Sequence, residues 1–173
     1  MTARHLAWGA GGLAAALLLG AMAWGLGHPA NGPADAVLGK QAPDLVVQGL
    51  DGQRASLTAL RGQPVVLNVW ASWCAPCRQE EGPLRTAAQR WAGRVAFLGV
   101  DFRDTPAAAR AAQQRARYPY PVGPAVPGIP AAYSVTGPPE TFFIDGRGVV
   151  AARFVGPLDA QLIDRYLQLV GVG

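Results

Sequence analysis

The sequence is poor in the side chains that most often bind metal ions. Its 173 residues include two cysteines, Cys74 and Cys77, and two histidines, His5 and His28. A structural zinc site needs four ligands, mostly Cys or His, and both histidines precede the segment in which globular patterning begins. We therefore expect no metal site.

Basic residues are present but not clustered. The chain has one lysine, Lys40, and fourteen arginines that are scattered without a long run, and its net charge is +4. Nucleic-acid binding requires a clustered basic face, so we expect no nucleic-acid partner. The sequence also lacks an internal repeat and a glycine-rich loop after a strand, which a phosphate-binding site would need.

Charge is absent from Leu6 to Leu26. Twenty-one residues suffice to cross a hydrocarbon core about 30 Å thick, and a tryptophan stands near each end, as interfacial aromatic residues do. Arg4 precedes this segment and no Lys or Arg follows before Lys40. The positive-inside rule therefore predicts a transmembrane anchor at residues 6–26, with residues 1–5 in the cytoplasm.

A cleaved signal peptide is the alternative, because Ala21-Met22-Ala23 fits a small-x-small cleavage site. Residues 27–38 are rich in Gly and Pro and have no periodicity, which is typical of a linker. With either interpretation, the globular domain at residues 39–173 lies outside the cytoplasm, where disulfide chemistry is expected.

The two cysteines form the motif around which this domain is organised. They follow the apolar run Val65–Trp70, which is typical of a strand buried on both faces, and precede a helix predicted from Arg78 to about Trp91. Cys74 then lies at or near the helix N-cap, where free backbone N–H groups and the helix dipole stabilise a thiolate. We expect Cys74 to attack a substrate disulfide from an exposed edge, and Cys77, on the same helix face, to resolve the mixed disulfide from behind it.

Two other interpretations of the cysteine pair are weaker. A structural Cys74–Cys77 bridge closes so small a ring that it would stabilise the fold little, and half a zinc site would lack its other two ligands. A C-x-x-C pair beside a strand–helix pattern favours a redox-active Cys74–Cys77 disulfide that needs no cofactor.

The rest of the domain alternates strands and helices. The patterns predict strands at 44–50, 95–100, 141–144 and 149–155, a helical turn at 56–60, helices at 106–117 and 158–170, and a loop at 118–130 with room for a short strand at 121–123. This order predicts an α/β fold with a mixed central β-sheet, parallel at first and completed by a hairpin, flanked by helices on both faces.

Taken together, these features resemble a thioredoxin fold. More narrowly, the chain resembles the membrane-tethered, periplasm-facing TlpA/DsbE-like thiol:disulfide oxidoreductases over about residues 39–173. The segments that carry the resemblance are Ala42–Asp44, Asn68–Cys74, Gly99–Asp101 and Gly137–Asp145.

The resemblance implies several site residues. A cis-proline that faces the cysteine pair is matched by Pro139, and residue 138 would present its backbone to an extended substrate. That position usually holds a non-proline residue, so Pro138 is a departure that removes a backbone N–H. Trp73, Pro138 and Pro139 are therefore the expected substrate-binding residues.

Two glutamates match acidic positions of the family. Glu80 is three residues beyond Cys77 and shares a helix face with both cysteines. A carboxylate there would oppose a second negative charge and could relay the proton of Cys77, so Glu80 is grouped with Cys74 and Cys77 as catalytic. Glu140, next to Pro139, is a possible second member of this proton relay. A solvated surface charge is the competing interpretation for both glutamates.

The direction of exchange follows from charge. Ala75 and Pro76, between the cysteines, add no positive charge, and Glu80 would work against the helix dipole. Strong oxidants depend on a strongly stabilised thiolate, so we expect a reductant or weak oxidant. The resemblance implies protein disulfide clients, such as apocytochrome c or its maturation partners, and a membrane thiol transporter as electron donor. It also implies a single-pass protein of the bacterial inner membrane with a periplasmic catalytic domain.

Two alternative functions stay open at this point. One is a thioredoxin-fold peroxidase. The other is a non-catalytic copper-binding or chaperone module, since two thiolates suit Cu(I).

Overall fold

The structure is a computed structural model that describes residues 36–172. The predicted anchor or signal at residues 6–26 and most of the linker at 27–38 lie outside the described residues. Within residues 36–172, no helix combines the length and the apolar character needed to cross a membrane. The domain boundaries at residues 5, 26 and 38 stay predictions.

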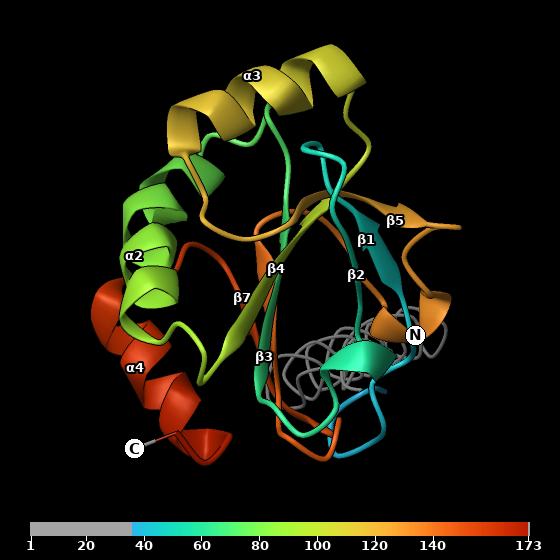
Figure 1. The fold of residues 1–173 in the computed structure, drawn as a ribbon, viewed down its shortest axis with the longest axis vertical. Helices are drawn as coiled ribbons and strands as arrows, with labels where there is room; N and C mark the ends of the chain where they lie inside the picture. Colours follow the sequence, from blue (N-terminus) through green and yellow to red (C-terminus); the bar gives the residue numbers. More distant parts are fainter. Residues whose placement is uncertain (1–35, 173) are drawn as a thin grey trace, which may run out of the picture. The chain divides into compact units, whose positions relative to one another are not determined.

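In the described part of the chain, seven strands form one mixed sheet in the order β2-β1-β5-β4-β3-β6-β7 (Figure 1). The pairings β3–β4 and β4–β5 are parallel, and the others are antiparallel. The strands are β1 Val46–Gln48, β2 Arg54–Ser56, β3 Val65–Trp70, β4 Ala96–Asp101, β5 Val122–Val126, β6 Glu140–Ile144 and β7 Val150–Val155. The predicted mixed α/β sheet is therefore confirmed, with β3 at its predicted bounds.

Among the described residues, three α-helices and two 3₁₀ turns cover the sheet. They are α2 Cys77–Arg90, α3 Pro106–Ala116, α4 Ala160–Leu169, η2 Thr58–Leu60 and η3 Ala131–Tyr133. The buried apolar residues of all three α-helices belong to a single hydrophobic cluster on one face of the sheet. The cluster on the other face receives Leu57, beside η2, and Tyr133 of η3. On that second face, the predicted helical cover consists, among the described residues, of 3₁₀ turns.

Two strands depart from the sequence-based prediction. Residues 54–56 form β2, so the helical turn predicted from residue 56 begins only at Thr58. Within the predicted loop 118–130, residues 122–126 form β5, which pairs with β1 on one side and β4 on the other. Both strands owe their conformation to pairing with β1, which local sequence patterns do not reveal.

The start of α3 provides a test of local helix capping. Thr105 has an extended backbone, and its hydroxyl accepts a 3.3 Å hydrogen bond from the Ala108 N–H, while Pro106 occupies the first helical position. Thr105→Ala should therefore lower the free energy of unfolding by about 1 kcal/mol, measured by urea denaturation. Thr86→Ala is the matched control, because Thr86 is exposed in the middle of α2. An equal loss in both variants would contradict this role.

Candidate active site

The cysteine pair lies between the carboxyl end of β3 and the start of α2. A disulfide joins Cys74 to Cys77, with their Cα atoms 5.4 Å apart. The Cys77 N–H donates a 3.1 Å hydrogen bond to Cys74 Sγ, in the way that a first-turn amide contacts a capping side chain. Cys77 is the first residue of α2 and Pro76 is its N-cap, so Cys74 stands just before the helix. The predicted strand-to-helix placement of the pair is confirmed.

The exposure of the pair differs from the expectation. Cys74 was expected at an exposed edge, yet Cys74 and Cys77 are each only 3% exposed in the disulfide form, because both pack into the cluster that contains Trp70 and Ala71. The adjacent Trp73 is 58% exposed. The predicted substrate-binding side chain is therefore available at the surface, whereas the sulfurs are shielded beside it.

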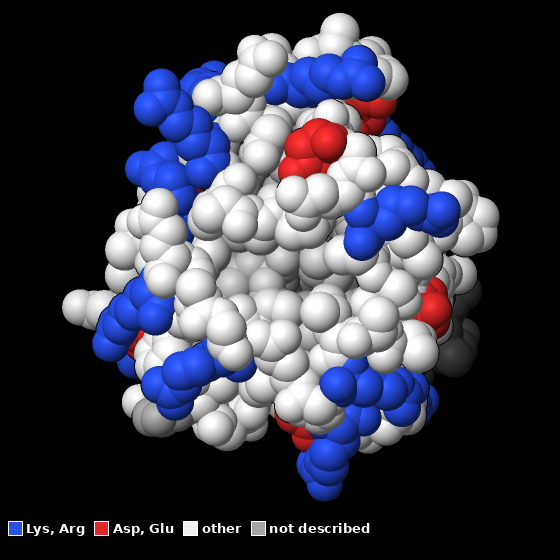
Figure 2. Space-filling view, viewed as in Figure 1, with Lys and Arg blue, Asp and Glu red and all other residues white. Residues whose placement is uncertain are grey.

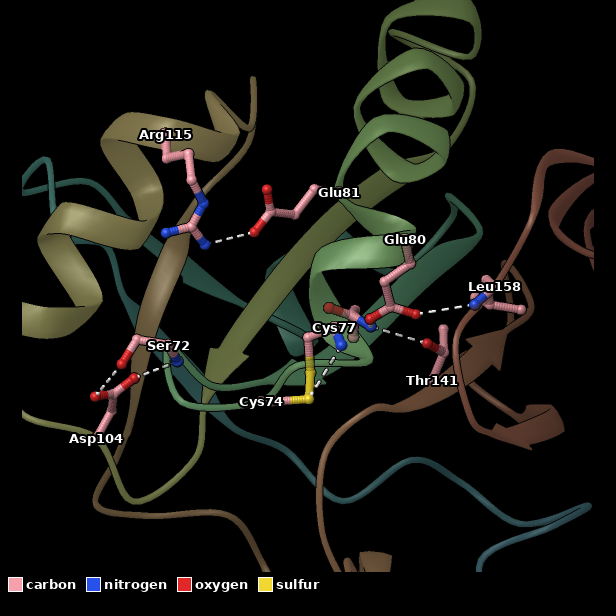
Figure 3. The surroundings of a disulfide bond; sticks show 10 residues. Ser72, Cys74, Cys77, Glu80, Glu81, Asp104, Arg115, Thr141 and Leu158 are labelled. Atoms are coloured by element: carbon pink, nitrogen blue, oxygen red, sulfur yellow. Dashed lines mark hydrogen bonds and ion pairs between the residues drawn. A yellow bond between two sulfur atoms is a disulfide. The ribbon is translucent and has the colours of Figure 1, made fainter.

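Residues 71–76, between β3 and α2, are here called the cysteine loop. The loop that follows β4 holds them in place (Figure 3). Asp104 accepts hydrogen bonds from the Ser72 hydroxyl at 2.8 Å and from the Ser72 N–H, and also from the Thr105 N–H. The Trp73 indole N–H donates to the Arg103 carbonyl at 3.3 Å. Sequence reasoning did not identify Asp104, because its partner lies 32 residues earlier in the chain.

Glu80 is fully buried one turn along α2 from Cys77 (Figure 3). Its carboxylate accepts hydrogen bonds from Asn68 Nδ2 at 2.8 Å and from the Leu158 N–H at 3.1 Å. Asn68 Nδ2 also donates to Thr141 Oγ1 at 3.0 Å, which links α2 to β3 and β6. Burial, only partly offset by the bonds from Asn68 and Leu158, raises the pKa of Glu80 to about 7. The interpretation of Glu80 as a solvated surface charge is therefore wrong.

Residues 136–139, here called the proline loop, lead into β6. They lie at the same end of the sheet as the cysteine loop, which follows β3. The register pairs Glu140, the first residue of β6, with Val69 near the end of β3. The Pro138–Pro139 peptide bond is cis, as the resemblance implies. Pro139 is buried and its carbonyl accepts a 2.9 Å bond from the Gly156 N–H, while Pro138 is half-buried. A second cis bond, Val126–Pro127, was not anticipated.

Glu140 is also fully buried, but it lies on the other face of the sheet. Alternation along β6 puts Thr141 on the face of Glu80, and Glu140 on the opposite face with Phe142. Its carboxylate accepts hydrogen bonds from Thr136, Gly137 and Arg153. Although burial alone would raise the pKa of Glu140, these bonds outweigh it and hold the pKa below its usual range.

The structure therefore separates the two glutamates that the sequence grouped together. Glu80 stands on the face of the cysteine pair with a pKa suited to proton exchange near neutral pH. Glu140 is ionised near neutral pH, and its oxygens are occupied by the proline loop and Arg153. These contacts argue against the predicted proton-relay role of Glu140 and also against a solvated surface charge. Among residues 36–172, no three His, Cys, Asp or Glu side chains are grouped so as to hold a metal ion.

The chain is similar in sequence to proteins described as thiol:disulfide interchange proteins. The chain is 39% identical to the thiol:disulfide interchange protein DsbE of Allochromatium vinosum over 127 residues, which cover 71% of this chain and 69% of that protein. It is 33% identical to DsbE of Escherichia coli over 162 residues, which cover 87% of this chain and 82% of that protein.

A solved structure shares both the fold and part of the sequence. A putative thiol:disulfide interchange protein DsbE from Chlorobium tepidum superimposes with a TM-score of 0.69 and 27% identity, over 77% of this chain and 96% of that one. The family model described as AhpC/TSA family matches residues 38–153, which span the cysteine loop, Glu80 and the proline loop. The chain therefore belongs to the AhpC/TSA family of thioredoxin-like proteins and is a thiol:disulfide oxidoreductase of the DsbE type.

Proposed function

We propose that the chain reduces disulfides of client proteins outside the cytoplasm through the Cys74–Cys77 dithiol. The observation that carries this proposal is the buried Glu80, whose pKa is raised to about 7 one helical turn from Cys77. An ionised carboxylate there opposes negative charge on the sulfurs. A strongly oxidising site needs its reduced form to be stabilised, so this arrangement favours donation of electrons to a client.

The reaction consists of two exchange steps. The Cys74 thiolate attacks one sulfur of the client disulfide, so a Cys74–client bond forms, the client disulfide breaks and a client thiolate leaves. Cys77 then gives up its proton and attacks Cys74 Sγ, which forms the Cys74–Cys77 disulfide and releases the second client thiolate. The client gains two electrons and two protons, and the dithiol loses the same. We propose that no cofactor takes part.

Glu80 provides a place for the proton of Cys77. Cys77 and Glu80 are three residues apart on α2, so they share one helix face. A carboxyl with a pKa near the working pH is suited to take up and return a proton. We propose that Glu80 accepts this proton during the second step. The exposed Trp73 and the backbone of the cis Pro138–Pro139 loop would then contact the client on either side of the disulfide.

The proposed setting and partners rest on the relatives and on the N-terminal sequence. We propose that residues 6–26 anchor the protein in the bacterial inner membrane and that the domain from residue 39 faces the periplasm. A membrane thiol transporter would reduce the Cys74–Cys77 disulfide, and apocytochrome c or its maturation partners would be the clients. Figure 2 shows the basic side chains in separate groups around the margin of one face, which favours a protein partner over a nucleic acid.

Insulin reduction and a reduction potential test this proposal. With dithiothreitol as the electron source, the protein should reduce insulin disulfides, and its potential against glutathione should lie between about −180 and −270 mV. A potential near −120 mV, typical of the strongest oxidants, would contradict the proposed direction. Consumption of hydrogen peroxide without a client disulfide would support a peroxidase instead. Tight stoichiometric Cu(I) binding without insulin reduction would support a copper module.

A further inference from the structure

A buried ion pair lies behind the proline loop, on the face of the sheet opposite the cysteines. Arg153 of β7 donates to Glu140 Oε2 through both Nη2, at 2.7 Å, and Nε, at 3.2 Å. The side chains of Arg153 and Glu140 are 6% and 0% exposed. Both donors reach the same oxygen, so this two-pronged, charge-assisted contact anchors Oε2 and leaves Oε1 directed towards other partners.

The other carboxylate oxygen of Glu140 holds the proline loop. Glu140 Oε1 accepts hydrogen bonds from Thr136 Oγ1 at 2.7 Å, from the Thr136 N–H at 2.8 Å and from the Gly137 N–H at 3.1 Å. Thr136 and Gly137 immediately precede the cis Pro138–Pro139 bond. The position of this loop therefore depends on one carboxylate oxygen, and the orientation of that carboxylate depends on Arg153.

Arg153 is itself fixed by the sheet. It stands opposite Phe142 in the β6–β7 register, and its guanidinium lies over the Phe142 ring with Cζ 5.7 Å from the ring centroid. The same strand pair continues to the Gly156 N–H, which donates to the Pro139 carbonyl at 2.9 Å. β7 and the residue that follows it thus support the proline loop twice, through the charge of Arg153 and through the backbone N–H of Gly156.

We propose that Arg153 is a positioning residue for client binding, which fixes the Thr136–Pro139 loop through Glu140 without touching the client. This inference rests on the proposed function, in which the client lies along that loop. A loop held in one conformation lowers the entropy that binding must remove. Loss of Arg153 should therefore weaken client binding more than it slows the exchange of sulfurs at Cys74.

The charges around Glu140 make this proposal testable by pH. Arg153 is the charged side chain that hydrogen-bonds Glu140, and Thr136 and Gly137, its other partners, are neutral. On the nearby η3, burial raises the pKa of Tyr133 well above its usual range, so Tyr133 stays neutral. Without Arg153, the pKa of the buried Glu140 should rise, and protonation should weaken its hold on the loop as the pH falls.

The experiment compares Arg153→Met with wild type in insulin reduction from pH 5 to pH 8. At pH 8 we expect KM to rise about tenfold with kcat changed less than about twofold, and alkylation of Cys74 by iodoacetamide to be unchanged. The kcat/KM of Arg153→Met divided by that of wild type should be lower at pH 5 than at pH 8 by a factor of about three or more. Adding Glu140→Gln to Arg153→Met should abolish this pH dependence, because it removes the titrating group.

Each result bears on the proposal. A KM within about twofold of wild type, or a pH-independent ratio in a folded Arg153→Met protein, overturns it. If Arg153→Met does not fold, Arg153→Lys decides, since lysine keeps the charge but not the two-pronged contact: KM should rise about threefold, and an unchanged KM overturns the proposal. If wild type fails to reduce insulin, the proposed function fails. The KM and kcat/KM of Arg153→Met relative to wild type are then measured for oxidation of a reduced peptide dithiol.

Discussion

The Cys74→Ser variant should lose insulin reduction by a factor on the order of 10³ or more, down to the rate without enzyme. A hydroxyl is not ionised near neutral pH and cannot form the bond to the client sulfur, so the first exchange step has no substitute. Near-complete loss is expected although Cys74 is only 3% exposed, because in the proposed function Trp73 and the proline loop guide the client to that sulfur. The measurement is the rate of insulin reduction with dithiothreitol as the electron source, compared with the rate without enzyme.

Cys77→Ser should slow turnover to the rate at which dithiothreitol itself resolves the mixed disulfide, and without dithiothreitol it should leave a different product. The first step proceeds and the second cannot, so Cys74 stays bonded to its client. Incubation with bacterial periplasmic extract, followed by non-reducing electrophoresis and mass spectrometry, should reveal mixed disulfides that dithiothreitol releases. Cys74→Ser/Cys77→Ser is the matched control and should capture nothing. Equal capture by the Cys74→Ser variant, or alkylation of Cys74 no faster than that of a buried structural thiol in the reduced protein, would contradict the assigned roles.

The sequence predicted the part of the site that is local in the chain. The apolar run Val65–Trp70 and the helix signals after it placed Cys74 and Cys77 at a strand–helix junction, as observed. Helical spacing alone placed Glu80 on the face of the cysteines. The helix predicted from residue 106 begins there, as α3 Pro106–Ala116.

The features that the sequence could not predict depend on partners far along the chain. The burial of Glu80 is completed by the Leu158 N–H, 78 residues later, and the cysteine loop is held by Asp104, 32 residues after Ser72. β5 contains Gly123 and Pro124, which are poor strand formers, and it is a strand because β1 and β4 flank it. Such contacts are set by tertiary packing, whereas local propensity describes only neighbours in sequence.

Glu80 and Glu140 show why a buried glutamate cannot be assigned a role from burial alone. Both are fully buried, yet the pKa is raised for Glu80 and lowered for Glu140. Glu80 accepts hydrogen bonds from two neutral groups, Asn68 and Leu158, which do not offset the loss of hydration. Glu140 accepts three bonds from the proline loop and two from the cation Arg153. The environment thus brings the pKa of Glu80 close to neutral pH and keeps Glu140 ionised there.

Glu80→Gln should remove a pH dependence of stability that wild type shows. A glutamate of the unfolded chain ionises near pH 4.5 and Glu80 near pH 7, so between these values the folded state binds more protons. The free energy of unfolding therefore falls as the pH rises through this range. A change in the Glu80 pKa from 4.5 to about 7 corresponds to a decrease of roughly 3 kcal/mol in the free energy of unfolding as the pH rises. Glu80→Gln should not show this decrease. Urea denaturation of the oxidised protein at pH 4.5 and pH 8 measures the difference.

Glu81→Gln is the matched control for this experiment, because Glu81 is the next residue on α2 and pairs at the surface with Arg115. It should keep the wild-type decrease in stability between pH 4.5 and pH 8, since Glu80 is still present. Glutamine at position 80 can accept a hydrogen bond from the Leu158 N–H. It can also donate one to the Asn68 side-chain oxygen if the Asn68 amide flips, so the variant should fold. A decrease of wild-type size in Glu80→Gln would show that other groups cause it. Glu80 would then not hold a proton near neutral pH, and the proton acceptor for Cys77 would have to be sought elsewhere.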